Sequence, residues 1–376
     1  MMWKAVWYQQ NNILLKGMVN KMDAKAMDIL KRALEKNASD VYIVAGCPLA
    51  YKINGEIVNE SEEKLTPGET LRIVGEIYSI YGNKKMDELE KAGDDDFSFA
   101  ISDLGRFRCN AYKQRGSYAA VLRIVRFELP NYKELDIPDT VIGMSSFSKG
   151  LVLVTGPTGS GKSTTLACII DEINQTQKKH IITIEDPIEF MHRHKMSIVS
   201  QREVDNDTLD YGTALRAALR QSPDVILMGE MRDYETISTV MTAAETGQLV
   251  FSTLHTIGAA KTIDRIIDVF PANQQQQVRI QLSMVLQAVV SQQLVPGVNG
   301  ELIPAFEIMI VNSAIRNMIR ESKVFQMDNV IYSGQSEGMR TMDSELLRLY
   351  KEGKISGETA IMYSTNSDLM IKKCQQ

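Results

Sequence analysis

The sequence is poor in the residues that build disulfide-linked, zinc-binding and membrane-spanning proteins. It has four cysteines in 376 residues, and no two of them form a C-x-x-C pair, which argues against a zinc knuckle or a disulfide framework. No apolar run approaches the roughly 18 residues that a membrane span needs, and the N-terminus lacks the charged-then-apolar pattern of a signal peptide. We therefore expect a cytoplasmic protein whose membrane association is peripheral.

An excess of basic charge is also missing. The chain has 42 Lys and Arg against 47 Asp and Glu, a net charge of −5, so no global field attracts it to nucleic acid or anionic lipid. Hydrophobic residues make up 44% of the chain, which is enough for proper cores. The length predicts two or three domains.

One motif stands out, and it is a phosphate-binding loop. An apolar run over 151–154 is typical of a buried strand, Gly156–Ser163 fits G-x-x-x-x-G-K-S, and a helical pattern follows. The glycines can turn successive backbone N–H groups toward phosphate oxygens, and the helix N-terminus adds its positive dipole end. The residues expected to bind ATP are Gly156, Pro157, Thr158, Gly159, Ser160, Gly161, Lys162, Ser163 and Thr164.

The chain before this loop has the pattern of a small α+β domain. A helix is expected over 23–36 with Asp23 as a possible N-cap, and Asn54-Gly55 predicts a hairpin turn. Thr66-Pro67-Gly68-Glu69 has the sequence of a helix start, and alternating strands are expected over 97–101, 105–112 and 119–125. Residues 1–20 have no clear period and are left as an unassigned N-terminal extension. The predicted domains are 21–128, a proline-flanked linker at 129–140, and 141–376.

Four arginines lie on or between the last strands of this first domain, namely Arg106, Arg108, Arg115 and Arg123. Each can be plain surface charge. Alternatively, some of them reach a triphosphate, because phosphoryl transfer profits from a guanidinium that neutralises developing charge.

From residue 151 onward, strands and helices alternate, which predicts a parallel sheet with helices on both faces. Ligands in such sheets gather at the carboxyl ends of the strands. Glu185 follows the apolar run 180–184, Glu230 follows 225–228, and His255 follows 249–252. We expect these three side chains to line the ATP site.

Their chemistry suggests roles. Glu230 is favoured as the general base that orients the attacking water, with Glu185 as the alternative. His255 can sense the γ-phosphate by hydrogen bonding, although a lone histidine is equally often structural. A magnesium ion is expected with the ATP, held by the Ser163 hydroxyl and, through water, by Glu230.

The end of the chain is expected to be mainly helical, from about residue 259. Helices are predicted over 259–268 and 274–293, and a hairpin over 294–310. Further helices are predicted over 312–321, 343–352 and 356–363.

Four motifs in this order resemble those of the type II/IV secretion ATPases. The P-loop, Thr183–Phe190, Asp224–Asp233 and Thr246–Thr256 are similar to the Walker A, aspartate, Walker B and histidine boxes of that superfamily. In addition, Ala314–Lys323 resembles the signature helix of the type IV pilus retraction ATPases, the PilT-like branch. The resemblance covers residues of about 22 to 365.

The resemblance implies a homohexamer whose subunits pair a PAS-like N-terminal domain with a RecA-like ATPase domain, with ATP between them. It implies Glu230 as the catalytic glutamate, Glu185 and His255 as further active-site residues, and Arg108 and Arg123 as the arginines that meet the nucleotide. In such a motor, ATP hydrolysis drives pilus retraction and twitching motility. The implied partners are an inner-membrane platform protein and, indirectly, pilin, at the inner face of the cytoplasmic membrane.

Two positions depart from the pattern. Tyr42 replaces an expected histidine, and Ile257 stands where relatives often carry asparagine. These departures leave open an accessory retraction paralogue, and a pilus assembly or secretion ATPase is a further alternative. Assembly ATPases, however, typically carry a tetracysteine zinc element that this chain lacks. A nucleic-acid translocase is disfavoured by the acidic charge, and a silent nucleotide-dependent scaffold by the carboxylates at two strand ends.

Overall fold

The computed structural model describes residues 25–375 except 54, 83, 84, 102, 103, 126–128 and 232. The chain divides into two compact units, one up to Arg126 and the other from Phe127 onward. The predicted extension over 1–20 and the predicted N-cap Asp23 lie outside the described residues. None of the helices in the described ranges is long and apolar enough to cross a membrane.

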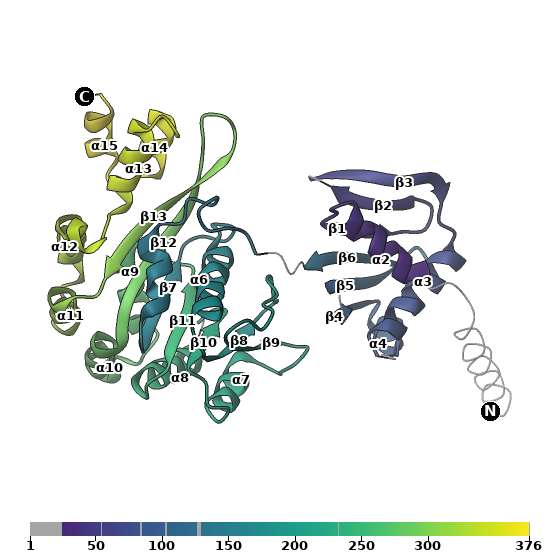
Figure 1. Cartoon of the computed structure of the whole chain (residues 1–376), viewed down its shortest axis with the longest axis horizontal. Coiled ribbons are helices and arrows are strands. Elements are labelled where there is room, and N and C mark those ends of the chain that lie inside the picture. The colour runs from purple at the N-terminus through teal and green to yellow at the C-terminus, as the bar shows by residue number, and fades with distance from the viewer. Residues whose placement is uncertain are drawn as a thin grey trace. The chain divides into compact units, whose positions relative to one another are not determined.

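The first unit is a small α+β fold, as its alternating sequence predicts. Its strands are β1 (Asp40–Ile43), β2 (Pro48–Ile53), β3 (Glu56–Lys64), β4 (Asp94–Ile101), β5 (Gly105–Gln114) and β6 (Ser117–Val125). Its helices are α2 (Lys25–Glu35), α3 (Pro67–Ile80) and α4 (Asp87–Ala92), the last of which the sequence analysis missed. The strands form one sheet in the order β3-β2-β1-β6-β5-β4, and every neighbouring pair is antiparallel (Figure 1).

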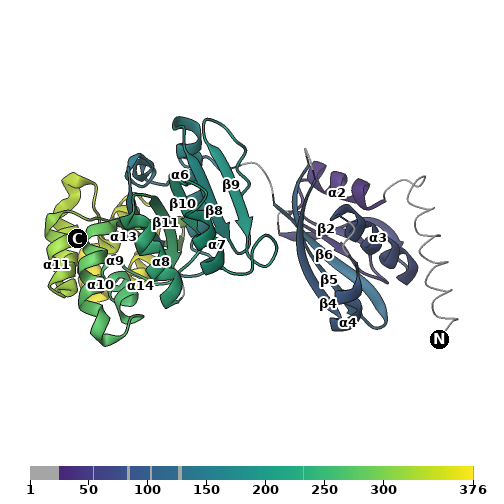
Figure 2. The same ribbon diagram turned by 90° about the horizontal axis from the view of Figure 1, so that it is seen from below.

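The helices in the described part of this unit pack on one face of the sheet. Helices α2 and α3 pack there (Figure 2), over buried side chains such as Phe107, Cys109 and Leu122. Because successive residues of a strand point to opposite faces, Arg108 and Arg123 stand on the other face. Helix α3 begins with the predicted capping box: the Thr66 hydroxyl accepts from the Glu69 N–H, and the Glu69 carboxylate accepts from the Thr66 N–H.

The second unit is built on a mixed sheet with helices on both faces. Its strands are β7 (Gly150–Thr155), β8 (His180–Glu185), β9 (Ile198–Glu203), β10 (Val225–Met228), β11 (Leu249–Leu254), β12 (Leu286–Pro296) and β13 (Leu302–Ile310). They lie in the order β13-β12-β7-β11-β10-β8-β9, and all neighbours are parallel except β12 and β13. The predicted parallel sheet is thus present, with one antiparallel edge strand.

The helices of this unit bury both faces of the sheet. Those before the C-terminal module are α5 (Asp139–Ile142), α6 (Lys162–Thr176), α7 (Tyr211–Ala218), α8 (Tyr234–Glu245), α9 (Ala259–Asp268) and α10 (Ala272–Val285). In β7, Leu151 and Leu153 pack into the core shared with α8, α9 and α10, whereas Val152 and Val154 pack into the core shared with α6. Burial on both faces explains why β7 reads as a continuous apolar run.

The prediction of one helix over 274–293 is wrong. Helix α10 ends at Val285, and the chain enters β12 at Leu286. The β-branched residues Val289 and Val290 pair with β7 on one side and with β13 on the other. Sheet pairing with β7, over 130 residues away, overrides a helical spacing that is only local.

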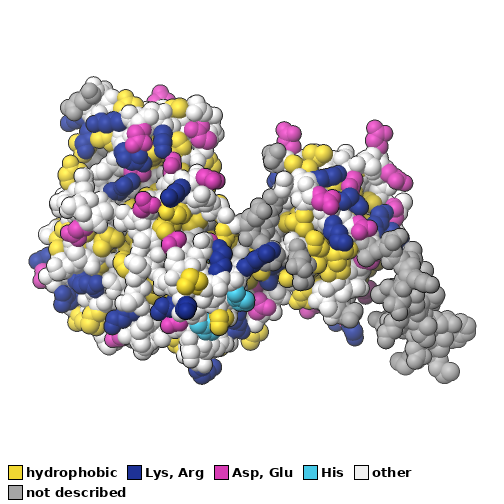
Figure 3. Space-filling view, viewed as in Figure 1, with side chains coloured by type: hydrophobic (Ala, Val, Ile, Leu, Met, Phe, Trp, Pro, Cys, Tyr) yellow, Lys and Arg dark blue, Asp and Glu magenta, His cyan; other side chains and the backbone are white. Residues whose placement is uncertain are grey.

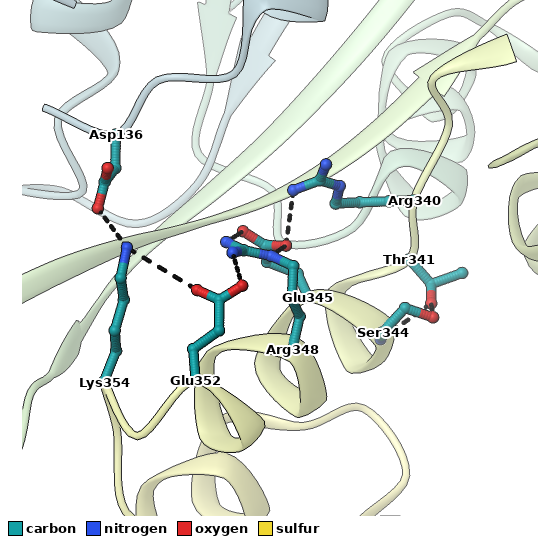
Figure 4. Close-up of polar contacts among 8 residues, drawn as sticks. All are labelled: Asp136, Arg340, Thr341, Ser344, Glu345, Arg348, Glu352 and Lys354. Atoms are coloured by element: carbon teal, nitrogen blue, oxygen red, sulfur yellow. Dashed lines mark hydrogen bonds and ion pairs between the residues drawn. The ribbon is translucent and has the colours of Figure 1, made fainter. Parts of the chain in front are cut away.

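The C-terminal module consists of α11 (Ser313–Arg320), α12 (Met327–Ser333), α13 (Met342–Lys351), α14 (Gly357–Tyr363) and α15 (Ser367–Cys374). Its last three helices share a small core with Val295, Ile303 and Ala305 of the β12–β13 hairpin. A charged network borders this core (Figure 4). In it the buried Glu345 carboxylate pairs with Arg340 at 2.7 Å and with Arg348 at 2.8 Å, while Lys354 pairs with Asp136.

Candidate functional site

The P-loop has the backbone that phosphate binding requires. Gly159 and Gly161 adopt φ values of 78° and 86°, and Gly161 is the N-cap of α6. At Gly156 a side chain has no room, because an added Cβ would lie 2.1 Å from the backbone oxygen of Gln292. The positive φ values explain the glycines at 159 and 161, and the close approach of β12 explains the one at 156; Gly156 and Gly161 are the two glycines that the motif fixes. The resulting loop presents its backbone N–H groups at the start of α6.

The charged and polar groups of the loop have few partners of their own. The Lys162 ammonium donates to the backbone oxygens of Gly156 and Pro157, both at 2.9 Å. Burial lowers the pKa of Lys162, while the nearby carboxylates of Glu189 and Glu230 raise it. The Ser160 hydroxyl is buried and has no hydrogen-bond partner within the described part of the chain. A polyphosphate would give both groups a partner, so the loop fits a nucleotide.

Gln292 is a residue of this site that the sequence analysis missed. It lies one residue beyond the β12–β7 pairing, and its side-chain oxygen accepts from the Thr165 hydroxyl at 2.7 Å. Its side-chain nitrogen lies 2.9 Å from where a Cβ on Gly161 would be. The side chain thus buttresses the loop from the neighbouring strand. Gln292 lies in the middle of β12, and the wrong prediction of a helix over 274–293 hid that strand.

Glu185 stands at the carboxyl end of β8, as predicted. It accepts a hydrogen bond from the Thr183 hydroxyl at 2.6 Å and one from the Gln201 amide at 3.3 Å. Burial raises the pKa of its carboxyl to about 7, although both donors oppose that shift. Gln201 also accepts from the His192 N–H at 2.7 Å. Gln201 comes from the edge strand β9, which the sequence analysis missed, so its role in orienting Glu185 was missed as well.

Glu230 and His255 lie close together at the ends of β10 and β11. The Nε2 of His255 is 3.4 Å from a carboxylate oxygen of Glu230. Glu230 is 8% exposed, whereas the His255 side chain is half exposed. The Thr253 hydroxyl donates to the backbone oxygen of Gly229 at 2.5 Å and so holds the two strand ends together. A buried carboxylate beside a more accessible imidazole can take up a proton and pass it outward.

A small cavity lies between the P-loop serine and the ends of β8 and β10. It has a volume of about 30 Å³, which is enough for a water molecule, and it is lined among others by Ser163, Glu185, His192, Gly229 and Thr253. Hydroxyl and carboxylate oxygens are the ligands that Mg²⁺ prefers. Ser163 of the P-loop, Glu185 and Gly229 before Glu230 all line this cavity. Their meeting agrees with the expectation that ligands bind at the carboxyl ends of parallel strands.

The two predicted arginines belong to the first unit. Arg108 and Arg123 lie directly opposite each other in the β5–β6 pair. Both are exposed, and the Arg123 Nε donates to a carboxylate oxygen of the buried Asp40 at 3.1 Å. Two guanidinium groups thus stand side by side on the sheet face that α2 and α3 leave free.

The match to known proteins covers both units. The family model described as type II/IV secretion system protein matches residues 18–368. The chain belongs to this family. The resemblance to pilus retraction ATPases that the sequence motifs indicated is also confirmed.

Within the type II/IV secretion family, the relatives point to pilus motors. The type IV pilus retraction ATPase PilT of Pseudomonas aeruginosa is 47% identical over 89% of this chain and 96% of its own length. A twitching motility protein of Neisseria gonorrhoeae is 43% identical over 92% of this chain and 91% of its own. Among solved structures, the pilus retraction motor PilT with bound ADP has a TM-score of 0.83 and 49% identity, covering 92% of this chain and 98% of that one.

Proposed function

We propose that the protein is an ATPase of the secretion family that drives type IV pilus retraction and thereby twitching motility. The observation that carries the proposal is the 47% identity to a retraction ATPase over 89% of this chain. The structure supports it, because Ser163 of the P-loop and the strand-end residues Glu185 and Thr253 line one cavity. The ADP in the structure of the pilus retraction motor supports ATP as the substrate. Assembly and secretion ATPases remain the less favoured reading, since the retraction ATPase aligns over nearly its full length.

In the proposed reaction each residue has a separate task. The P-loop N–H groups and the Lys162 ammonium hold the phosphates, and Lys162 would exchange its backbone acceptors for phosphate oxygens. Glu230 accepts the proton of the attacking water. His255, whose Nε2 lies 3.4 Å from Glu230, forms a hydrogen bond to the γ-phosphate. Glu185 is held in place by Thr183 and Gln201 beside the Ser163 hydroxyl. A magnesium ion, held by Ser163 and through water by Glu230, would neutralise phosphate charge.

Arg108 and Arg123 are proposed as the source of further positive charge for the transferred phosphate. Two adjacent exposed guanidinium groups on one sheet face suit an anion. Cooperation between copies of the chain, in a homohexamer, and coupling to an inner-membrane platform protein at the cytoplasmic face of the membrane belong to the same proposal. Pilin would be moved only indirectly.

The nucleic-acid translocase remains the alternative from another class. On the face shown in Figure 3, Lys and Arg side chains are scattered among Asp and Glu and do not gather into one stripe. A translocase that tracks a phosphate backbone needs such a stripe. This distribution and the net charge of −5 disfavour the alternative.

Two substitutions test the ATP site. Lys162→Ala should lower ATP hydrolysis at least about 100-fold, because it removes the cation that stabilises phosphate charge. Glu230→Gln should bind ATP normally but fail to turn it over. Wild-type hydrolysis by both variants would refute the site. Stimulation of hydrolysis by DNA, with steep salt dependence, would favour the translocase.

The direction of work needs a test in cells. Deletion of the gene in its host should leave pili that are retained or more numerous but no longer shorten, as imaged directly. Loss of pili on deletion would favour an assembly motor. Complementation with Lys162→Ala should leave the deletion phenotype unchanged.

A further inference from the structure

A buried carboxylate outside the ATP site joins two helices that come from distant parts of the second unit. Glu307 lies in β13 and is 6% exposed. One of its oxygens accepts from the Ala259 N–H at 2.6 Å, and the other accepts from the Met342 N–H at 3.1 Å. Ala259 and Met342 are the first residues of α9 and α13. A single side chain therefore caps two helix N-termini at once.

On the α9 side, Glu307 fixes the end of the loop that carries His255. Helix α9 has no capping side chain of its own, because its N-cap is Gly258. The Gly258 N–H instead donates to the Ser291 hydroxyl of β12 at 2.9 Å, and the next N–H goes to Glu307. At its other end the loop leaves β11, which is paired with β7 up to Leu254. These two successive backbone anchors, together with a hydrogen bond between the Thr256 and Thr262 hydroxyls at 2.7 Å, hold the segment between Leu254 and Ala259 that places His255 against Glu230.

On the α13 side, Glu307 holds the beginning of the C-terminal module. The neighbouring residue Ile308 exchanges two backbone hydrogen bonds with Arg340, at 2.8 and 3.0 Å. Arg340 in turn pairs with the buried Glu345 of α13, as Figure 4 shows. Thr341, the N-cap of α13, already accepts from the Ser344 N–H. The bond from Met342 to Glu307 therefore adds a tie between the module and β13, and it is not needed to begin the helix.

The chemistry of this arrangement is unusual for a cap. Burial raises the pKa of the Glu307 carboxyl, and the two backbone N–H groups oppose that shift. A local serine or threonine could cap either helix without burying an acid. A remote carboxylate, unlike a local cap, links the two helices to each other. If α13 moves relative to β13 and the Glu307 carboxylate follows it, the hydrogen bond from the Ala259 N–H is strained as well.

We infer that Glu307 is a positioning residue, which places His255 against Glu230 and couples that placement to the first helix of the C-terminal module. The inference rests on the proposed ATPase function, because His255 matters only if the site hydrolyses ATP. Glu307 itself touches neither the P-loop nor the cavity beside Ser163.

Glu307→Gln tests the first half of the inference. The amide keeps the size of the side chain but presents an NH2 group to one of the two N–H donors. We expect kcat to fall about tenfold while KM and Kd for ATP stay within twofold of wild type. The matched control is Glu301→Gln, an exposed site in the turn of the same hairpin, which should behave as wild type. An unchanged kcat, or parallel changes of kcat and KM that follow a loss of folded protein, would overturn the inference.

A spectroscopic readout keeps the inference separate from the proposed function. The chain has four histidines, so spectra of protein labelled with ¹³C at the histidine ring resolve few signals, and His255→Asn identifies the one from His255. The His255 signal should move in Glu307→Gln and stay in place in Glu301→Gln. This result does not depend on turnover. If wild-type protein fails to hydrolyse ATP but the signal moves, the proposed function fails and the positioning stands; an unmoved signal overturns the positioning.

The tie to the module is tested through the backbone. Met342→Pro removes the N–H donor together with the buried side chain; proline is tolerated at the first residue of a helix, and Thr341 has the extended backbone that proline requires before it. Met342→Ala loses the side chain but keeps the N–H and serves as the control. We expect Met342→Pro to lower kcat and move the His255 signal, whereas Met342→Ala does neither. Equal behaviour of the two variants would overturn the coupling to the module, and the pair also replaces Glu307→Gln if that variant does not fold.

Discussion

The two sheets of this molecule carry their polar chemistry in different places. The antiparallel sheet of the first unit has helices on one face, and Arg108 and Arg123 stand on the other. The mixed sheet of the second unit is buried on both faces, so its polar residues, Glu185, Glu230 and His255, come where strands end. A sheet with a free face can present charge to solvent across its strands, whereas a covered sheet presents charge to a ligand at the ends of its strands. A charged residue inside a covered strand, such as Glu307, needs partners within the protein. The predictions below test this division of labour.

The largest expected effect concerns the free face of the first sheet. Arg108→Ala and Arg123→Ala should each lower kcat for ATP hydrolysis about 100-fold, because a guanidinium that neutralises phosphate charge is lost. The free energy of unfolding should change little for Arg108→Ala, because that side chain is exposed, whereas Arg123→Ala should also destabilise the first unit, because the buried Asp40 carboxylate loses a donor. The control is Lys113→Ala, which removes an exposed basic residue of β5, the strand that carries Arg108. This variant should hydrolyse ATP at the wild-type rate. Full activity of both arginine variants would show that the free face carries surface charge only.

The next effect concerns buried charge at the end of the second unit. Glu345→Gln should lower the free energy of unfolding by roughly 2–4 kcal/mol, because the buried carboxylate between Arg340 and Arg348 loses its charge. Glu352→Ala removes a carboxylate that is 43% exposed in the same network and should cost less than about 1 kcal/mol. Urea denaturation measures both. Equal losses for the two variants would contradict the importance of burial in this network.

A third prediction concerns pH and the buried His192, which lies in the loop between β8 and β9. Burial lowers the pKa of His192 to about 4 from its ordinary 6.5. As the pH falls, His192 therefore takes up a proton at a higher pH in the unfolded chain than in the folded chain. The contribution of neutral His192 to the free energy of unfolding is complete above pH 6.5 and is lost as the pH falls toward 4. His192→Gln should reduce this acid-induced loss by about 1–3 kcal/mol in denaturation curves recorded across that range. Curves for wild type and variant that stay parallel would argue against a buried neutral imidazole.

The smallest effect belongs to the first unit alone. Thr66→Ala removes the hydroxyl that caps α3 and should destabilise this unit by about 1 kcal/mol. Amide hydrogen exchange separates the units, and faster exchange should be confined to residues before 126. Faster exchange in both units would mean that they unfold together.

Local patterns predicted much of this structure. The P-loop, the strand ends that carry Glu185, Glu230 and His255, and helix α9 over 259–268 all follow from short motifs or periodicity. The capping box at Thr66 is likewise a signal contained in four residues. Features of this kind depend on neighbours in sequence, so a single chain suffices to find them.

Residues whose role depends on distant strands were missed. Gln292 lies in β12 and Glu307 in β13. Most of β12 fell within the predicted helix over 274–293, because the apolar residues at 280, 284, 285 and 288 repeat at helical spacing. Gln201 acts from β9, an edge strand with a weak apolar pattern. In each case the partner lies in another part of the sheet or loop, and no local signal names it.

The ion pair between Asp136 and Lys354 joins residues 218 positions apart. The first unit, by contrast, closes its most distant described side-chain bond, from Arg123 to Asp40, over 83 positions. During synthesis the first unit can therefore complete its packing while the second is still being made. The second unit cannot, because β12 must reach β7 and the C-terminal helices must reach the segment before α5. A ribosome stalled before residue 286 would hold a finished first unit followed by an ATPase sheet with β7 left as an open edge.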